Sequence, residues 1–197
     1  MSYKQKLEDL IRRNKGMILT KDVSAEGIPR EYISKLVEDG ILMKIDRSSY
    51  ISKEGMDDKM YRIQAIHPCA IFSHESALYL HGIPGTDELI YSITVPTGYN
   101  SKTLKEAGVL IHFAKKDFYT LGICSSMTPY GREIKVYDLE RSICDLLRSK
   151  NHIESSVIAK TIKFYANRTD NNLSKLIEYA NILKVSKKLQ IYIDVLL

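Results

Sequence analysis

The apolar residues in the first third of the chain recur every three or four positions, which is the spacing of one face of an α-helix. The stripe that predicts a first helix, over residues 2–15, consists of Tyr3, Leu7, Leu10 and Ile11. A short second helix is expected to begin at Thr20, whose hydroxyl suits an N-cap. Gly27 then provides a turn, and Pro29 fits the first turn of a third helix that ends at Gly40.

Short apolar runs replace the helical spacing after Gly40. Residues 41–45 and 49–52 are separated by Asp46-Arg47-Ser48, which predicts a β-hairpin with a basic tip. The run Met17–Leu19 is expected to add a third strand. Helix, turn, helix and basic hairpin are the elements of a winged helix-turn-helix. In that fold the second helix of the pair enters the major groove of DNA, and we expect the hairpin to contact the phosphate backbone.

The cations of this segment lie where a DNA-facing surface requires positive charge. The predicted DNA-binding residues are Arg12, Arg13, Lys15, Lys21, Arg30, Tyr32, Ser34, Lys35, Lys44, Arg47, Ser48 and Ser49. The acidic residues Glu31, Glu38 and Asp39 are then expected to point away from DNA. Two alternatives stay open. The basic cluster at the end of the first helix also complements the helix dipole, and winged domains also bind proteins.

Gly55 and the aspartates after it mark a change of pattern, so we place a domain boundary there. Residues 1–56 form the expected winged helix-turn-helix DNA-binding domain, and residues 57–197 form a second, α+β domain. Helices are expected from Asp57 or Asp58 to Pro68, over residues 73–81, and from Asp138 to Leu147, followed by three more in the tail. The strands expected from β-branched runs cover residues 89–95, 109–114, 121–124 and 134–137.

The predicted fold class is therefore α+β: an N-terminal winged helix-turn-helix followed by a mixed-sheet α+β domain with a helical C-terminal half. Composition changes this picture little. The chain has 44% apolar and 27% charged residues, as folded globular proteins do, and its net charge of +5 permits nucleic-acid binding without requiring it. The first six residues lack the apolar core of a secretory signal, and the three cysteines lie far apart. We therefore expect a cytoplasmic protein without a disulfide framework.

Residue types that hold metals occur near the middle of the chain. His67, Cys69 and His74 are close in sequence, but no CxxC partner accompanies them, and we expect no zinc site. His81 and His112 are expected to be structural histidines with satisfied hydrogen bonds.

Carboxylates and a lysine in one helical segment raise a different hypothesis, a metal-dependent nuclease. Asp138, Glu140, Asp145 and Lys150 are the residues concerned. A simpler interpretation treats Asp138 as an N-cap and the others as the solvated face of one helix. No phosphate-binding glycine loop and no nucleophile with a base are recognisable, so we do not expect an enzyme.

The order of several segments resembles that of AbiEi-type antitoxins, which belong to type IV bacterial abortive-infection toxin–antitoxin systems of phage defence. The matching segments are residues 27–33, 36–42, 45–51, 72–82, 93–96 and 136–146. One departure concerns the wing tip, which is Asp46-Arg47-Ser48-Ser49 here and often glycine-rich in the family.

The resemblance implies two functions. The winged domain would bind inverted repeats of double-stranded operator DNA upstream of its own operon and repress it. The C-terminal domain would counteract a nucleotidyltransferase-type toxin without a stable complex, and no cofactor is implied. The surface expected to carry antitoxicity consists of Glu75, Tyr79, Glu140, Arg141 and Arg148. The alternative is a winged-helix regulator whose C-terminal domain senses a ligand.

Overall fold

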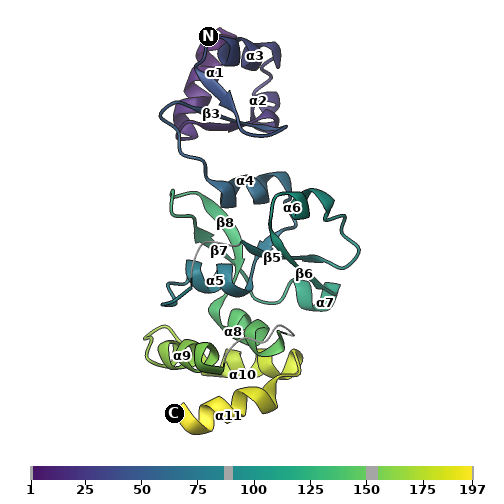
Figure 1. Cartoon of the computed structure of the whole chain (residues 1–197), viewed down its shortest axis with the longest axis vertical. Helices are drawn as coiled ribbons and strands as arrows, with labels where there is room; N and C mark the ends of the chain where they lie inside the picture. The colour runs from purple at the N-terminus through teal and green to yellow at the C-terminus, as the bar shows by residue number, and fades with distance from the viewer. Residues whose placement is uncertain (1, 87–90, 150–154, 197) are drawn as a thin grey trace. The chain divides into compact units, whose positions relative to one another are not determined.

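Residues 2–86, 91–149 and 155–196 are described by the structure, which is a computed structural model of the whole chain. The chain divides into two units, unit 1 up to Ile66 and unit 2 from His67 (Figure 1). The division lies at residue 66, whereas the sequence pattern predicted a boundary after residue 56. The difference concerns helix α4 (Lys59–Ile66), which groups with unit 1.

Unit 1 contains the predicted helices and hairpin. Its remaining elements are α1 (Tyr3–Arg13), β1 (Met17–Leu19), α2 (Thr20–Ala25), α3 (Glu31–Glu38), β2 (Leu42–Lys44) and β3 (Ser49–Ser52). The strands form an antiparallel sheet in the order β1-β3-β2, so the expected third strand is confirmed. Helix α1 begins with a capping box, in which the Ser2 hydroxyl accepts from the Gln5 backbone N–H and the Gln5 side chain accepts from Ser2 N.

The core of unit 1 follows the apolar stripes. Its buried members are Leu7, Leu10, Ile18, Val23, Ile28, Ile33, Leu36 and Leu42. Each fully buried aliphatic side chain contributes about 1.5–3 kcal/mol relative to exposure.

Thr20 differs from expectation, because Leu19 is the N-cap of α2 and no side chain caps this helix. The Thr20 hydroxyl instead donates to the Ser48 carbonyl at 3.2 Å and ties α2 to the hairpin.

Helix α4 is joined to unit 1 by charged and polar contacts. Arg62 Nη1 lies 2.7 Å from Asp46 Oδ2 in the hairpin turn, and Arg62 Nη2 lies 3.0 Å from Asp57 Oδ2. Lys21 Nζ of α2 donates to the Ala65 carbonyl at 2.8 Å. Asp58 accepts from the Tyr61 N–H, as expected of a residue that begins this helix. These contacts explain why the structural division follows α4.

Unit 2 is built on a five-stranded sheet, and the expectation that the sheet is mixed is confirmed. Its strands are β4 (Ile71–Phe72), β5 (Ser92–Pro96), β6 (Leu110–Ala114), β7 (Ile123–Met127) and β8 (Glu133–Tyr137), in the order β6-β5-β4-β8-β7. The pairs β4–β8 and β5–β6 are parallel, and β4–β5 and β7–β8 are antiparallel. The two-residue strand β4 was not predicted, and the first residues of the predicted strand 89–95 lie outside the described residues.

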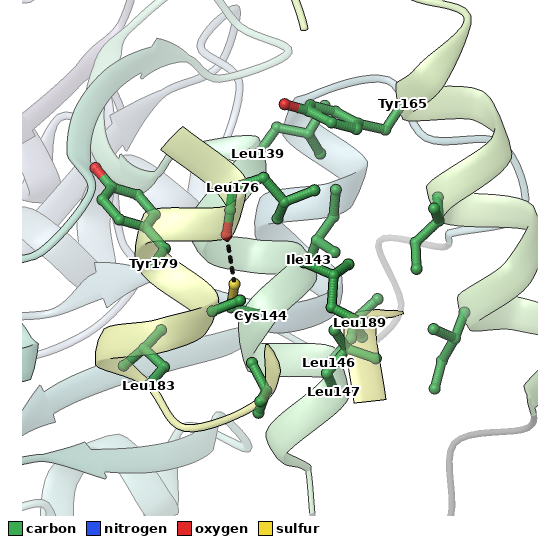
Figure 2. Packing of buried hydrophobic residues seen from close by; sticks show 14 of the residues in the cluster. Leu139, Ile143, Cys144, Leu146, Leu147, Tyr165, Leu176, Tyr179, Leu183 and Leu189 are labelled. Carbon is green, nitrogen blue, oxygen red and sulfur yellow. Dashed lines mark hydrogen bonds between the residues drawn. The ribbon is translucent and has the colours of Figure 1, made fainter. Parts of the chain in front are cut away.

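Among the residues that the structure describes, three short helices pack against this sheet, and four longer ones form the C-terminal half of unit 2. They are α5 (His74–Leu80), α6 (Lys102–Glu106), α7 (Lys116–Tyr119), α8 (Leu139–Arg148), α9 (Ser155–Ala166), α10 (Leu173–Ile182) and α11 (Ser186–Leu196). Helix α8 packs against α5, α9, α10 and α11, and every residue from Leu139 to Leu147 is buried. Figure 2 shows this apolar core, in which the Cys144 thiol lies against the Leu176 carbonyl. No helix within the described ranges is long and apolar enough to cross a membrane.

Candidate nucleic-acid interface

Helices α2 and α3 are held together by a short turn around buried apolar residues. The Ile28 N–H donates to the Val23 carbonyl, and both side chains are buried in the core of unit 1. Gly27 has a φ of +67°, a conformation that glycine adopts at low cost. Arg30 occupies the N-cap position of α3 and is exposed. This arrangement presents the first turn of α3 to solvent, as the second helix of a winged helix-turn-helix requires.

The exposed stripe of α3 is of mixed charge. Its exposed residues are Glu31, Ser34, Lys35 and Glu38. Their spacing, i, i+3, i+4 and i+7, places all four on one helical face, opposite the buried Ile33 and Leu36. The expectation that Glu31 and Glu38 point away from a DNA-facing helix surface is therefore wrong. A glutamate on such a surface repels phosphate and accepts a hydrogen bond from the amino group of cytosine.

Tyr32 lies at the edge of this stripe and contacts α1. Its ring centroid is 5.4 Å from that of Tyr3, and Lys35 Nζ lies 5.2 Å from the same ring. The aromatic ring thus holds the ammonium group over α3 by a cation–π interaction. Tyr32 is half-buried, so its side chain orients Lys35 and is only partly accessible to a ligand.

The wing turn between β2 and β3 is organised by Asp46. Its Oδ1 atom accepts from the backbone N–H groups of Ser48 and Ser49, at 2.8 and 3.0 Å, while Oδ2 pairs with Arg62. Burial alone would raise the pKa of Asp46, but the hydrogen bonds from Ser48, Arg62 and Ser49 outweigh it and hold the pKa below its ordinary value. Asp46 thus fixes the turn whose exposed residue is Arg47.

Two predicted contact residues of the wing are turned inward. Ser49 is fully buried, and its hydroxyl makes no hydrogen bond within the described residues. Ser48 is half-buried, its backbone N–H donates to Asp46, and its carbonyl accepts from the Thr20 N–H and hydroxyl. The structure therefore contradicts a DNA contact by the Ser49 side chain. The alternation of strand residues explains it, because Ser49 and Ile51 share the inner face of β3.

The predicted cations at the end of α1 and in α2 interact with other groups of the chain. Arg13 Nη2 lies 2.9 Å from Glu26 Oε1, and Arg12 Nη1 lies 3.5 Å from Asp9 Oδ1. Lys21 donates to the Ala65 carbonyl. Lys15 is exposed and has a φ of +50° at the end of α1. Arg12, Arg13 and Lys21 thus take part in surface interactions, and a phosphate contact would compete with them.

The remaining predicted cations are available on the surface. Arg30, Lys35, Lys44 and Arg47 are all exposed, and none of them forms an ion pair within the described part of the chain. Lys44 and Arg47 belong to the wing, and Arg30 and Lys35 belong to α3. The helix and the wing thus each contribute two exposed cations, and the exposed Ser34 lies between those of α3.

The predicted antitoxin surface of unit 2 is mostly inside the fold. Glu140 is 6% exposed and Arg141 is 1% exposed, so both residues are core residues and the expectation of a solvated face is wrong. Glu75 and Tyr79 are half-buried, and Glu75 Oε2 accepts from the Ser92 hydroxyl at 2.9 Å. Arg148 alone of the five predicted residues is exposed.

The charged side chains of α8 can be buried because they form ion pairs and hydrogen bonds, several of them with residues from distant segments. Arg141 Nε lies 3.0 Å from Asp145 Oδ2, and Glu140 Oε1 accepts from the Tyr165 hydroxyl at 3.0 Å. Lys175 Nζ lies 2.9 Å from Asp138 Oδ2. The role of Asp138 as N-cap is confirmed by its bond from the Arg141 N–H. The hypothesis of a solvated acidic face fails for Glu140 and Asp145, while Lys150 lies outside the described residues.

The histidines divide into satisfied and unsatisfied ones. His81 Nε2 contacts the Tyr137 carbonyl at 2.8 Å, which fits its expected structural role. His112 does not fit that expectation, because its Nε2 atom is buried and has no hydrogen-bond partner among the described residues. His67 Nδ1 contacts the Tyr99 hydroxyl. Within the described residues, no three histidine, cysteine or acidic side chains are grouped as a metal site requires.

Sequence reasoning missed the residues that position the wing. Arg62 lies in a helix that was assigned to the second domain, and its pairing with Asp46 had no sequence signal. The role of Asp46 in the turn, in contrast, does have a sequence signal. Asp followed two residues later by Ser is a pattern in which the carboxylate accepts from nearby backbone N–H groups. The exposed stripe of α3 could also have been predicted, from the spacing of Glu31, Ser34, Lys35 and Glu38.

Comparison with known families concerns unit 1. Residues 5–52 match the model of a family described as "Transcriptional regulator, AbiEi antitoxin". The matched residues include the helix pair and the wing, from within α1 to the end of β3. Over these residues the match agrees with the resemblance to AbiEi-type antitoxins inferred from the sequence. A comparison with curated proteins found no match.

Proposed function

We propose that this chain, whose unit 1 matches the AbiEi antitoxin regulators, is a DNA-binding autorepressor and antitoxin. Unit 1 binds inverted repeats at the promoter of its own operon. Unit 2 counteracts a nucleotidyltransferase-type toxin without forming a stable complex with it. The observation that carries the proposal is the family match over residues 5–52, which are the residues that form the helix pair and the wing.

The exposed charges of unit 1 support different roles for α3 and the wing in DNA binding. Helix α3 is the element that enters the major groove, where Arg30 and Ser34 meet base edges or the adjoining phosphates. The wing turn is short and presents Arg47, with Lys44 on the strand before it. A short turn with two cations contacts the phosphate backbone and supplies affinity without reading many bases.

The antitoxin half of the proposal has a different basis. The family description names an antitoxin, and the segments 72–82, 93–96 and 136–146 carry the resemblance into unit 2. The toxin class and the inverted repeats are inferred from that resemblance. The alternative of a regulator with a ligand-sensing C-terminal domain is favoured by one observation, a polar cavity in unit 2 that is described below.

The test of DNA binding is a gel-shift titration of the full chain on its own promoter at several salt concentrations. Lys44→Ala and Arg47→Ala are expected to weaken binding to all sequences alike, because each removes a phosphate contact. The slope of log affinity against log salt should fall by about 0.9 for each lost contact. Lys53→Ala is the matched control, since Lys53 is an exposed cation at the other end of β3 from the wing turn.

Either of two results would contradict the proposed role of the wing. An unchanged salt slope together with an altered base preference would show that the wing reads sequence. An equal loss of affinity in Lys53→Ala would show that overall charge, and not the wing, determines binding. A promoter fused to a reporter gene then tests repression in cells, where the wing variants should release expression and the control should not.

A further inference from the structure

A polar cavity lies in unit 2 where three of the resembling segments converge. It has a volume of about 300 Å³, which is at the lower end of the range for small-molecule sites. Segment 72–82 supplies His74, segment 93–96 supplies Thr94, and segment 136–146 supplies Arg141 and Asp145. His112 of β6 and Arg148 at the end of α8 also line the cavity. Residues from four separate elements thus form one site.

The cavity carries an excess of positive charge. Arg141 Nε lies 3.0 Å from Asp145 Oδ2, and Arg148 Nη1 lies 3.9 Å from Asp145 Oδ1. Two guanidinium groups therefore share one carboxylate. Glu75 follows His74 in the chain, and its carboxylate accepts from the Ser92 hydroxyl; it does not line the cavity, although its charge acts on both His74 and His112. An anion bound between the two arginines would balance the remaining charge.

Arg141 is held rigidly with donors to spare. Its Nη1 group donates to the carbonyls of Phe118 and Leu121, and its guanidinium lies 4.2 Å from the centre of the Tyr137 ring. These bonds and the pairing with Asp145 use Nε and Nη1. A guanidinium has five N–H donors, and the bonds to Asp145, Phe118 and Leu121 use three of them. The others are available to the neighbouring Tyr137 hydroxyl and to a ligand in the cavity.

Two stacked imidazoles form another part of the lining. The rings of His74 and His112 lie 3.5 Å apart at an angle of 13°. The Thr94 hydroxyl donates to Ser73 Oγ, which contacts His74 Nδ1 at 3.1 Å. This chain of hydrogen bonds fixes the orientation of the His74 ring.

Burial favours the neutral form of both histidines. Burial, and next the neighbouring His112, lower the pKa of His74 to about 3, and burial lowers the pKa of His112. His112 Nε2 is a buried polar atom with no partner within the described ranges. His74 has a φ of +51°, which is a costly conformation for a residue with a Cβ. Unsatisfied polar groups and backbone strain of this kind concentrate at binding sites.

We propose that this cavity binds the phosphate group of a small phosphate monoester, with Arg141 and Arg148 as the charged ligands and the imidazole pair as further hydrogen-bonding groups. A phosphate oxygen accepts from planar guanidinium groups in pairs, which suits two arginines fixed around one carboxylate. Phe113, half of whose side chain is exposed, also lines the cavity and offers an apolar surface for the rest of the ligand. This site does not depend on DNA binding or on antitoxin action.

The test is isothermal titration calorimetry of the full chain with four probes: inorganic phosphate, ribose 5-phosphate, adenosine monophosphate and adenosine. Phosphate and at least one monoester are expected to bind, and adenosine is not. Arg148→Gln should weaken monoester binding about tenfold or more, because a charge-assisted contact is lost while the exposed side chain leaves the core intact. Lys187→Gln, an exposed cation of α11, is the matched control.

An independent readout separates a specific site from general attraction of anions. The imidazole NMR signals of His74 and His112 should shift on addition of the monoester, and those of His67 and His81 should not. His112→Gln should weaken binding without loss of the folded spectrum. The proposal is overturned if no probe binds at millimolar concentration, if adenosine binds as well as its phosphate, or if Lys187→Gln weakens binding as much as Arg148→Gln.

Discussion

The exposed residues of α3 carry both signs of charge, which bears on how this helix would recognise DNA. Glu31 and Glu38 lie on the same face as Lys35 and Ser34, so a DNA duplex approaching this face meets both signs of charge. Carboxylates near phosphate reduce affinity for DNA of any sequence. They also accept from the cytosine amino group, which gives a favourable contact only at the correct base pair. In the proposed complex with DNA, the acidic residues would thus favour discrimination over affinity.

We therefore expect Glu31→Gln and Glu38→Gln to increase binding to unrelated DNA. The ratio of operator to unrelated affinity should fall by about tenfold for a position that contacts cytosine, which corresponds to roughly 1.4 kcal/mol. Gel-shift titrations of both DNAs at one salt concentration measure this ratio. Arg30→Ala and Lys35→Ala should act in the opposite direction on affinity.

Glu54→Gln is the control for this series, because Glu54 is an exposed carboxylate beyond the end of β3. If the control increases affinity for unrelated DNA as much as the α3 variants do, total charge explains the result. If Glu31→Gln and Glu38→Gln leave both affinities unchanged in folded protein, this face of α3 does not approach DNA.

At the scale of elements, the wing turn and α4 act as one structural feature. Asp46 fixes the turn through Ser48 and Ser49 and connects it to α4 through Arg62. Arg62 in turn contacts both oxygens of Asp57. Burial opposes the charge of Arg62, but its hydrogen bonds to the two aspartates raise its pKa above the ordinary value. The orientation of Arg47 therefore depends on a helix outside the predicted winged domain.

Replacement of Asp46 by Asn tests this connection through its pH dependence. The pKa of Asp46 is lowered below 3.8 in the folded chain, so its contribution to stability is present above that pH. The contribution is lost as the pH falls through the lowered pKa. At neutral pH we expect Asp46→Asn to reduce the free energy of unfolding of unit 1 by about 1–3 kcal/mol, since it removes a charged partner of Arg62.

Urea denaturation followed by circular dichroism at neutral and acidic pH measures the difference. The gap between the wild-type chain and Asp46→Asn should shrink as the pH falls below 3.8. Asp39→Asn, which replaces an exposed aspartate at the C-cap of α3, should show little effect at either pH. A pH-independent gap would mean that Asp46 acts through its shape and not through its charge.

Helix α8 shows which part of an element the sequence predicts and which part it does not. The capping by Asp138 and the apolar positions predicted the helix and its first residue correctly. The prediction of a solvated face on α8 was wrong, because Tyr165, Lys175 and the carbonyl of Phe118 contact α8 from other segments. Helical periodicity records which residues are apolar, and it contains no information on partners far away in the chain. The cavity of unit 2 was missed for the same reason.

At the scale of the whole molecule, the structure has two units that each possess a core. The apolar cluster of unit 1 is formed by α1, α2, α3 and the sheet, and that of unit 2 is centred on α8. The alternation and periodicity of apolar residues predicted both cores, as well as the order of most elements. The boundary between the units was less predictable. Gly55 ends the hairpin, but the contacts of Arg62 and Lys21 extend unit 1 to the end of α4.

Two separate cores lead to the expectation that repression and antitoxicity can be lost independently. In the full chain, Lys44→Ala combined with Arg47→Ala should abolish promoter repression and leave rescue from the toxin intact. Both side chains are exposed in the wing and do not contribute to either core. A reporter gene on the promoter measures repression, and growth during expression of the proposed nucleotidyltransferase-type toxin measures antitoxicity.

The reciprocal variant is Leu176→Ala, which removes a side chain from the core around α8 and costs about 2–5 kcal/mol at such buried positions. It should reduce antitoxicity while repression persists, because unit 1 keeps its own core. Ile177→Ala is the matched control, since Ile177 is the next residue of α10 and is 48% exposed. If Leu176→Ala abolishes repression as fully as antitoxicity while the chain remains folded, DNA binding requires unit 2. The two activities then belong to the chain as a whole and not to its separate units.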